Sequence, residues 1–493
     1  MAKKKVEEFT IEEKLQNALI PEKDQPYKIP QNWCWVNWSS AGNLIAGNGF
    51  PNKYQGFKDY EIPFYKVGSL KLSDRQGYIF DDTNTINNDI FKILKCSLIP
   101  VNSILFAKIG EAIKLNRRSI NNKPCCIDNN MMAFIPKCCL FKYAYYWTTT
   151  IDLYKYAKAT IVPALRKIEL DFIPFPLPPL AEQERIVNKL DNYISKLNEA
   201  KEKLEKVVDT YEFRKYVILY KAFKGELTKN WRKENPNIES VDILLEKINQ
   251  EKQNLTKKRQ IRKDKDFIDE ETPYKIPNTW KWIKLKNICT KIVDGSHNPP
   301  KGESEKTDYI MLSATNIKDD KFIDLEKVRY LSKENFDLEN QRTNIQIGDI
   351  CFTSVGSIGR SCIFKGGLNI CFQRSVSIIT TPISSEYLKY FFDSSYFQNK
   401  VQFEARGSCQ VGFYLNQLAI SLIPLPPLEE QKEIVKILDS ILTKEKQVKE
   451  IAEKEIERVE DLKKNLLTRA FGGVLGTNDP NEENSIELLK SVL

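Results

Sequence analysis

The sequence predicts an α+β protein: two globular domains separated by two long antiparallel coiled-coil helices, with a pseudo-twofold internal repeat. Three observations support this prediction. Sequence motifs recur at a nearly constant offset along the 493 residues. Two proline-free stretches carry apolar residues at the spacing of a coiled coil. The remaining segments hold aromatic and β-branched residues in short alternating runs, which are typical of strands.

The internal repeat covers nearly the whole chain. Its motifs recur 247 residues apart near the start of each copy and 248 residues apart after that. The paired motifs are Pro-Tyr-Lys-Ile-Pro at 26–30 and 273–277, Trp33 and Trp35 with Trp280 and Trp282, Leu-Pro-Pro-Leu at 177–180 and 425–428, and Ala-Phe-x-Gly at 222–225 and 470–473. The period is far longer than that of a solenoid, so each copy is the size of a domain or more.

The last part of each copy also repeats. Asn-Pro-Asn at 235–237 resembles Asp-Pro-Asn at 479–481, and an apolar stretch follows each. The tail of the chain therefore resembles the segment that leads from the first domain into the second. Residues 9–15 are in position to lead into the first domain in the same way. We expect a nearly circular organisation, in which two halves pack about a pseudo-twofold axis and each end completes the other.

These boundaries divide the chain into seven segments. They are a helical lead-in at 1–25, a first globular domain at 26–180, a first long helix at 181–225, a basic helical connector at 226–272, a second globular domain at 273–428, a second long helix at 429–473 and a tail at 474–493.

The two long helices are predicted from apolar residues spaced alternately three and four apart. These residues are Val187, Leu190, Ile194, Leu197, Leu204, Val208, Tyr211 and Ile218 in the first copy, and Val435, Leu438, Leu442, Ala452, Ile456, Val459 and Leu466 in the second. About 40 helical residues would span about 60 Å. Each stretch ends at glycine, which suits a helix C-terminus.

Lys201 and Lys449 occupy matching positions in the two apolar stripes, and Glu445 stands where the first copy has Leu197. A polar residue at such a position can fix the register of a coiled coil. Two unrelated helices, each packed on its own domain, are the alternative. Equal length and equal phase favour mutual pairing, and tandem placement in one chain makes the pair antiparallel.

The globular segments read as short strands closed by turns, followed by helices. Residues 103–110 and 349–356 are β-rich runs that end in glycine. Helical patterns follow near 141–156 and 386–404. The boundaries of the two copies match closely while their interiors differ. A duplicated enzyme would tend to retain a shared reactive cluster, whereas a duplicated reader of two targets would vary its contacts.

Composition excludes several classes of protein. No run of 18 apolar residues is present, and no apolar signal core follows the basic N-terminus, so we expect a cytoplasmic protein with no membrane-spanning helix. The eleven cysteines include no Cys-x-x-Cys and there is one histidine, so neither a zinc site nor a disulfide framework is predicted. A net charge of +9 permits nucleic-acid binding without demanding it.

Enzyme motifs are also missing or imperfect. No glycine is followed by lysine, which rules out a phosphate-binding G-x-x-x-x-G-K-[ST] loop. Asn-Pro-Pro-Lys at 298–301 has lysine where adenine methyltransferases place an aromatic residue against the flipped base. The glycines at 472–476 match a helix stop in the first copy rather than a cofactor loop.

The repeated motifs carry a resemblance to a known family. The Pro-Tyr-Lys-Ile-Pro-x-x-Trp-x-Trp start, the closing segment at 423–431 and the helix after it resemble the target-recognition domains of DNA specificity subunits in type I restriction-modification systems. Asp-Gly-Ser-His-Asn-Pro-Pro at 294–300 resembles a segment common in such domains. The resemblance covers nearly the whole chain, twice.

The resemblance implies a non-catalytic subunit that recognises double-stranded DNA. Each recognition domain would read one half of a split target, and the helices would set the gap between the halves. Two methyltransferase subunits would dock on the helices, and two restriction subunits can join them. S-adenosylmethionine and ATP with Mg²⁺ would be bound by those partners, and no cofactor by this chain. The alternatives are a coiled-coil scaffold with protein-binding domains and an adenine methyltransferase.

Candidate DNA contacts are polar groups on loops of the two domains, because arginine, lysine, glutamine and asparagine bond base edges and phosphates. They are Lys53, Gln55, Lys108, Arg117 and Arg118 in the first domain, and His297, Arg342, Arg360, Gln373, Arg374, Arg406 and Gln410 in the second. The basic run at 252–265 could touch phosphates, although a solvated connector helix is the favoured interpretation.

Overall fold

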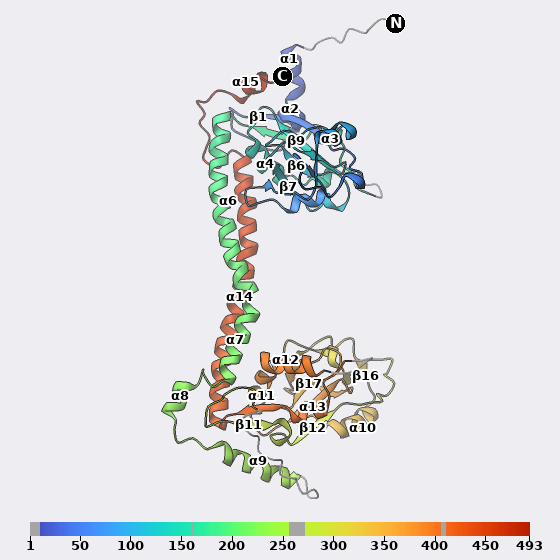
Figure 1. Ribbon diagram of the computed structural model, residues 1–493, viewed down its shortest axis with the longest axis vertical. Helices are drawn as coiled ribbons and strands as arrows, with labels where there is room; N and C mark the ends of the chain where they lie inside the picture. The colour runs from blue at the N-terminus through green and yellow to red at the C-terminus, as the bar shows by residue number, and fades with distance from the viewer. Residues whose placement is uncertain (1–9, 159–161, 256–271, 406–410) are drawn as a thin grey trace. The chain divides into compact units, whose positions relative to one another are not determined.

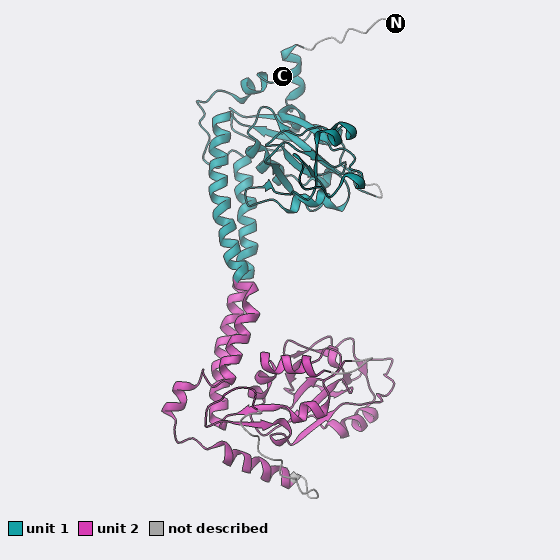
Figure 2. Cartoon of the chain, in the orientation of Figure 1, with its two compact units in different colours: residues 1–206, 452–493 teal, residues 207–451 magenta. Residues whose placement is uncertain are grey.

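A computed structural model describes residues 10–158, 162–255, 272–405 and 411–493. The chain divides into two compact units, which Figure 2 colours separately. Unit 1 comprises residues 1–206 and 452–493, and unit 2 comprises residues 207–451. Each unit therefore contains one globular domain together with parts of both long helices.

Unit 1 is built on a five-stranded sheet with the order β2-β9-β6-β7-β4, a three-stranded sheet with the order β5-β3-β8 and the antiparallel pair β1-β10. Its strands are β1 (Cys34–Asn37), β2 (Gly42–Ala46), β3 (Ile62–Tyr65), β4 (Tyr78–Ile79), β5 (Thr85–Ile86), β6 (Ile104–Ala107), β7 (Arg118–Asn121), β8 (Cys126–Ile127), β9 (Met131–Pro136) and β10 (Pro174–Leu177). Its shorter helices are α1 (Ile11–Ala18), α2 (Trp38–Ala41), α3 (Asn88–Leu94), α4 (Phe141–Thr150), α5 (Lys167–Asp171) and α15 (Ser485–Lys490).

Unit 2 repeats this plan. Its sheets have the orders β12-β20-β17-β18 and β16-β13-β19, with the pairs β11-β21 and β14-β15. Its strands are β11 (Lys281–Lys284), β12 (Lys291–Asp294), β13 (Tyr309–Leu312), β14 (Ile317–Lys318), β15 (Lys321–Phe322), β16 (Arg329–Tyr330), β17 (Ile350–Thr353), β18 (Ser361–Ile363), β19 (Asn369–Phe372), β20 (Val376–Thr380) and β21 (Leu422–Leu425). Its shorter helices are α8 (Lys229–Glu234), α9 (Val241–Leu255), α10 (Lys333–Thr343), α11 (Ser385–Phe392), α12 (Ser395–Glu404) and α13 (Leu415–Ile420).

The long helices run along each other in opposite directions within each unit (Figure 1). They are α6 (Leu180–Asp209), α7 (Tyr211–Phe223) and α14 (Leu428–Phe471). In unit 1 Lys201 Nζ of α6 lies 2.8 Å from Glu460 of α14. In unit 2 Arg214 Nε of α7 lies 2.7 Å from Glu445 of α14. The residue numbers fall on one helix as they rise on the other, as predicted for an antiparallel pair.

The first long helix differs from the sequence prediction because it is interrupted at Thr210. Helix α6 ends at Asp209 and α7 begins at Tyr211, so Thr210 alone separates them. The Arg214 side chain lies beside this interruption, where Nη1 donates to the Val207 carbonyl at 3.1 Å. The second long helix, α14, continues without a break for 44 residues. Lys449 Nζ lies 5.0 Å from the centre of the Tyr211 ring.

The core of each unit includes residues from the far end of the repeat. In unit 1 the core contains Ala470, Phe471 and Leu489, which are all almost fully buried. In unit 2 it contains Phe223 and Ile248, which precede the second globular domain in the chain. The long helix that contributes to each core, α7 or α14, is followed by a glycine with positive φ. A Cβ on Gly473 would lie 2.3 Å from Pro30, and one on Gly225 would lie 2.4 Å from Pro277. Residues from the end of the second copy therefore complete the core of unit 1, as the repeat predicts, whereas unit 2 is one continuous stretch of chain.

A hydrogen-bond network joins the domain, the helices and the tail in unit 1. The Glu182 carboxylate is buried in the first turn of α6. It accepts hydrogen bonds from the Trp33 indole at 2.7 Å and from the Thr477 hydroxyl at 3.1 Å. Burial raises the pKa of Glu182, although these two hydrogen bonds lower it in part. The next residue, Gln183, donates to the Pro178 carbonyl and accepts from the Leu140 backbone.

The network recurs in unit 2 with one addition. Glu430 accepts the Trp280 indole at 2.9 Å and the Thr228 hydroxyl at 2.7 Å. It also pairs with Arg232 at 3.0 Å. Unit 1 has a different charge pair near its buried carboxylate, Arg185 with Glu482 at 2.7 Å. The first and last motifs of each domain meet because β1 pairs with β10 and β11 with β21.

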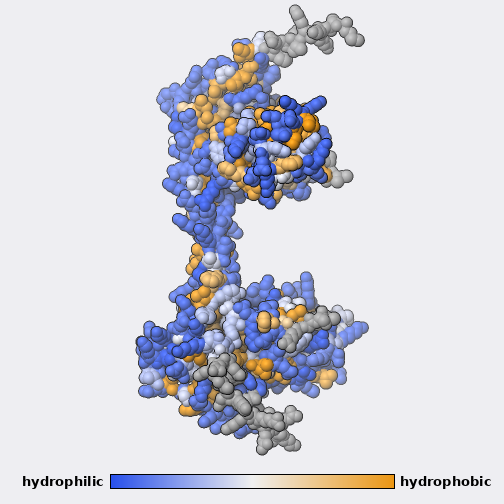
Figure 3. All heavy atoms as spheres, in the orientation of Figure 1, coloured by the Kyte–Doolittle hydropathy of each residue, from blue (hydrophilic) through white to orange (hydrophobic). Residues whose placement is uncertain are grey.

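The described cysteines are free thiols, and all but Cys139 are buried. Burial raises the pKa of the Cys125 thiol to about 12, which suits a packing role rather than a reactive one. Among the described residues no group of histidine, cysteine or carboxylate side chains is arranged to hold a metal ion. In the same part of the chain no helix has the length and apolar character needed to cross a bilayer. The face in Figure 3 is mainly hydrophilic, with scattered hydrophobic side chains.

Candidate nucleic-acid interface

In unit 2 four turns meet at one edge of the globular domain and surround a cavity of about 710 Å³. They follow β12, β13, β17 and β19. Their polar residues at the cavity are Ser296, His297, Ser313, Thr315, Ser357, Gln373, Arg374 and Ser375. Three predicted contacts therefore lie together, and the hydroxyl residues around them had not been predicted.

Backbone hydrogen bonds hold two of these turns against each other. The Ser296 amide donates to the Phe372 carbonyl at 2.7 Å, and the Arg374 amide donates to the Ser296 carbonyl at 2.8 Å. Only glycine fits at 295, because a Cβ there would lie 2.1 Å from the Phe372 carbonyl oxygen. The position of Gln373 and Arg374 is thus tied to the segment that carries His297.

Asp294, at the end of β12, holds two basic side chains. His297 Nε2 lies 2.7 Å from one carboxylate oxygen, and the Arg342 guanidinium bonds the other. Arg342 Nε also donates to the Asp294 carbonyl at 3.1 Å. Burial raises the pKa of Asp294, but the hydrogen bonds from His297 and Arg342 outweigh it and hold the pKa below its usual value. The carboxylate is therefore charged at neutral pH.

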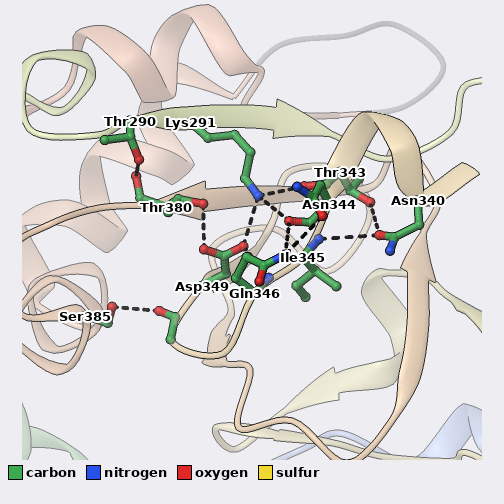
Figure 4. Close-up of polar contacts among 11 residues, drawn as sticks. Thr290, Lys291, Asn340, Thr343, Asn344, Ile345, Gln346, Asp349, Thr380 and Ser385 are labelled. Atoms are coloured by element: carbon green, nitrogen blue, oxygen red, sulfur yellow. Dashed lines mark hydrogen bonds and ion pairs between the residues drawn. The ribbon is translucent and has the colours of Figure 1, made fainter. Parts of the chain in front are cut away.

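The same strand fixes the end of the helix that carries Arg342 (Figure 4). Lys291 Nζ donates to the carbonyls of Thr343 and Asn344 at 2.7 and 2.8 Å, and it pairs with buried Asp349 at 3.1 Å. A cation is favourable at the C-terminus of a helix, where carbonyls lack partners. β12 thus binds the last turn of α10 at two places, Lys291 and Asp294.

The remaining predicted contacts of unit 2 lie apart from this group or outside the described residues. Arg360 is exposed, and its guanidinium donates to the Ile317 carbonyl at 3.3 Å. Arg406 and Gln410 lie outside the described residues, as do the basic residues that follow α9 at 256–265.

Unit 1 builds the same edge with different side chains. A Cβ on Gly47 would lie 2.0 Å from the Asp128 carbonyl oxygen, and the Asn48 amide donates to the Ile127 carbonyl at 2.9 Å. Gly47 and Asn48 therefore match Gly295 and Ser296. Counting outward from the glycine, Ala46 stands in place of Asp294, and Gly49 in place of His297.

The predicted contacts of unit 1 lie on loops near this edge. Lys53 is exposed and sits 4.8 Å from the centre of the Tyr54 ring. Gln55 is held within its loop, since it donates to the Phe50 carbonyl at 2.7 Å and accepts from Lys66 Nζ at 2.9 Å. Lys108 is half-buried. Lys66 had not been predicted; it follows β3 as Ser313, which was also not predicted, follows β13.

The arginine pair of β7 separates into one exposed and one buried residue. Arg117 is exposed and immediately precedes the strand. Arg118 is 7% exposed, and its guanidinium donates to the Arg117 carbonyl, Asn116 Oδ1 and the Ile151 carbonyl. Burial lowers the pKa of Arg118 to about 9. The prediction of a DNA contact at Arg118 is therefore corrected, because the side chain is buried and both of its Nη atoms bond groups of its own unit.

Comparison with known proteins explains the shared plan. A family model described as the type I restriction modification DNA specificity domain matches twice, at residues 30–209 and 277–458. The chain belongs to this family. The predicted family, the fold class and the function class, DNA specificity, are thereby confirmed.

Named members of the specificity family align over much of the chain. The EcoBI specificity subunit of Escherichia coli is 27% identical over 311 residues, which are 61% of this chain and 58% of that protein. The EcoKI specificity subunit of Escherichia coli K12 is 21% identical over 469 residues, 91% of this chain and 90% of that protein. Both are subunits of type I restriction enzymes.

Solved structures share the fold. A chain from a study of complex assembly and conformational transition of the type I R-M system aligns with a TM-score of 0.62, 15% identity, and coverage of 91% of this chain and 100% of that one. The HsdS subunit from Thermoanaerobacter tengcongensis aligns with a TM-score of 0.56, 15% identity, and coverage of 92% and 100%.

Proposed function

We propose that this chain reads a bipartite DNA target for a type I restriction-modification complex, one half at the loop edge of each unit. The observation that carries the proposal is the contrast between those edges. The two units share strand order and backbone hydrogen bonds there, yet unit 2 has Asp294 and His297 where unit 1 has Ala46 and Gly49.

The exposed groups suit DNA. In unit 2 Gln373 and the arginines Arg342 and Arg374 offer the donors and acceptors that read purine edges in the major groove, and His297 adds a further polar group. In unit 1 Lys53 and Arg117 are exposed cations suited to phosphates. Arg360, Lys66 and Lys108 are additional candidates beside these loops.

The remaining activities belong to partners in this proposal. Two methyltransferase subunits dock on the long helices and bind S-adenosylmethionine, and two restriction subunits with ATP and Mg²⁺ can join them. The chain itself binds no cofactor and acts in the cytoplasm. The relatives support a role within a larger complex, since both are named as specificity subunits of restriction enzymes.

The long helices act as a spacer between the half-sites. Helix α14 has 44 residues, which corresponds to about 66 Å at 1.5 Å per residue. Inserting or removing the same whole number of turns in both helices should change the gap in the target and leave each half unchanged. An unchanged gap would contradict the spacer role.

The direct test is selection from a randomised duplex library with the full chain and its methyltransferase partner, checked by methylation mapping of the host genome. We expect a motif with two defined halves and an unspecified gap. Enrichment of no sequence would overturn the proposal and favour a scaffold whose domains bind proteins.

A further inference from the structure

The strongest unassigned feature is the carboxylate of Asp294, which bonds two basic side chains at an edge otherwise suited to DNA. Its side chain is 15% exposed, while those of His297 and Arg342 are 53% and 54% exposed. A carboxylate at this place does not itself favour DNA, because it repels phosphates. Its partners come from two different elements, the turn after β12 and helix α10.

We propose that Asp294 is a positioning residue that determines specificity for the half-site read by unit 2. It fixes the directions of the His297 imidazole and the Arg342 guanidinium before DNA arrives. Preordered donors lose less conformational entropy on binding and reject mismatched base edges more strongly than mobile ones. This inference rests on the proposed function.

The surroundings of Asp294 indicate that it controls more than one contact. Its neighbour Gly295 packs against the Phe372 carbonyl, and Ser296 exchanges backbone hydrogen bonds with the turn that carries Gln373 and Arg374. The residue three positions before it, Lys291, binds the end of α10. One strand end therefore sets the positions of four predicted DNA contacts.

Unit 1 shows that the backbone of this turn does not need the carboxylate. Its equivalent segment retains the glycine and the backbone hydrogen bond, yet has Ala46 at the position of Asp294 and Gly49 at that of His297. The alanine variant Asp294→Ala thus reproduces a sequence that the same fold already accommodates. A purely structural role would predict a carboxylate in both units.

The test compares the full chain, with its methyltransferase partner, in wild-type form and as Asp294→Ala, Asp294→Asn and Asp337→Ala. Asp337 is exposed on α10, the helix that carries Arg342, so its alanine variant removes the same charge without touching His297 or Arg342. Each protein is used to select duplexes from the randomised library, and its melting temperature is measured.

We expect Asp294→Ala to weaken preference for one half of the target at least about fivefold, the lower end of what a good base contact contributes. The other half should be unchanged, and affinity for random duplexes should not fall, because a negative charge has been removed. Asp294→Asn retains an acceptor oxygen for Arg342 and should recover part of the preference. Asp337→Ala should match the wild type in both halves.

Retention of full preference by Asp294→Ala would overturn the inference. Equal loss in both halves with a lowered melting temperature would also overturn it, because that pattern indicates a structural role. An asparagine variant no better than alanine would contradict positioning through hydrogen bonds. Failure of the proposed function is distinguishable, since the wild-type chain would then select no bipartite sequence.

Discussion

The main sheets of units 1 and 2 share the order of four strands, β2-β9-β6-β7 and β12-β20-β17-β18, but the units differ in where their charges lie. At the loop edge unit 2 has Asp294 holding His297 and Arg342, while unit 1 has Ala46 and Gly49. At the junction with the long helices, both units place a buried glutamate between a tryptophan and a threonine. Buried groups with fixed partners are retained and exposed loop groups vary, as expected of a scaffold that carries two different readers.

The largest effect on stability is expected at Glu430, because this buried glutamate, unlike Glu182, pairs directly with an arginine. Glu430→Ala leaves the Arg232 guanidinium largely buried without its carboxylate, and we expect a loss of about 3–5 kcal/mol in unfolding free energy. Glu182→Ala removes only hydrogen bonds from the neutral Trp33 and Thr477, so about 1–3 kcal/mol is expected. Urea unfolding of the full chain, followed by fluorescence, gives both values. Equal losses would show that the extra arginine contributes nothing.

A smaller effect is expected from the glycines that the two loop edges share. Gly47→Ala and Gly295→Ala each place a Cβ about 2 Å from a backbone carbonyl oxygen, and we expect each to destabilise its own unit by about 1–3 kcal/mol. Gly49→Ala is the matched control, because a Cβ there meets no atom within 4 Å. Thermal unfolding monitored by circular dichroism distinguishes them. Destabilisation by the control as large as that of Gly47→Ala would contradict the packing argument.

The unfolding free energy should depend on pH in a way that reflects the titration of Glu182 in unit 1. Burial raises its pKa in the folded state, so its contribution to stability is present below the ordinary glutamate pKa of about 4.3 and is lost as the pH rises through the raised value. Glu182→Gln removes this titration. As the pH rises from about 4 to neutrality, we expect the Glu182→Gln variant to become more stable relative to the wild type, as measured by the unfolding free energy. A difference independent of pH would show that Glu182 titrates alike in both states.

The smallest effect is expected in the paired helices. Lys201 and Glu460 are partly exposed, so Lys201→Met should change the unfolding free energy by less than about 1 kcal/mol. Arg214→Met, in unit 2, removes an ion pair with Glu445 and also the bond to the Val207 carbonyl beside the helix interruption. It should therefore cost more than Lys201→Met. The same urea measurements decide the order.

Periodic features of this fold could be predicted from the sequence, and features that depend on one side chain could not. The repeat offset, the apolar stripes and the closing glycines define the two domains and the helix pair because burial imposes regular spacing. The interruption at Thr210 has no such pattern; it lies beside a hydrogen bond from Arg214 to a backbone carbonyl.

The candidate site was predicted in part for the same reason. His297, Gln373 and Arg374 were found because they stand in loops between strands, and they do line one cavity. Arg118 was assigned wrongly, although alternation along a strand sends one of two adjacent side chains inward. The ion pair between Asp294 and Arg342 joins residues 48 positions apart in the sequence, and local sequence patterns do not reveal such a contact.

The completion of the unit 1 core by residues from the end of the second copy also sets an order of synthesis. Unit 2 is a continuous stretch, residues 207–451, so the ribosome delivers it whole. Unit 1 begins first but needs Phe471 and Leu489 to complete its core. At roughly 5–20 residues per second, its first 206 residues wait about 14–57 seconds for Leu489, the later of the two. During translation the first domain made is therefore the last to close, and its core stays open until then.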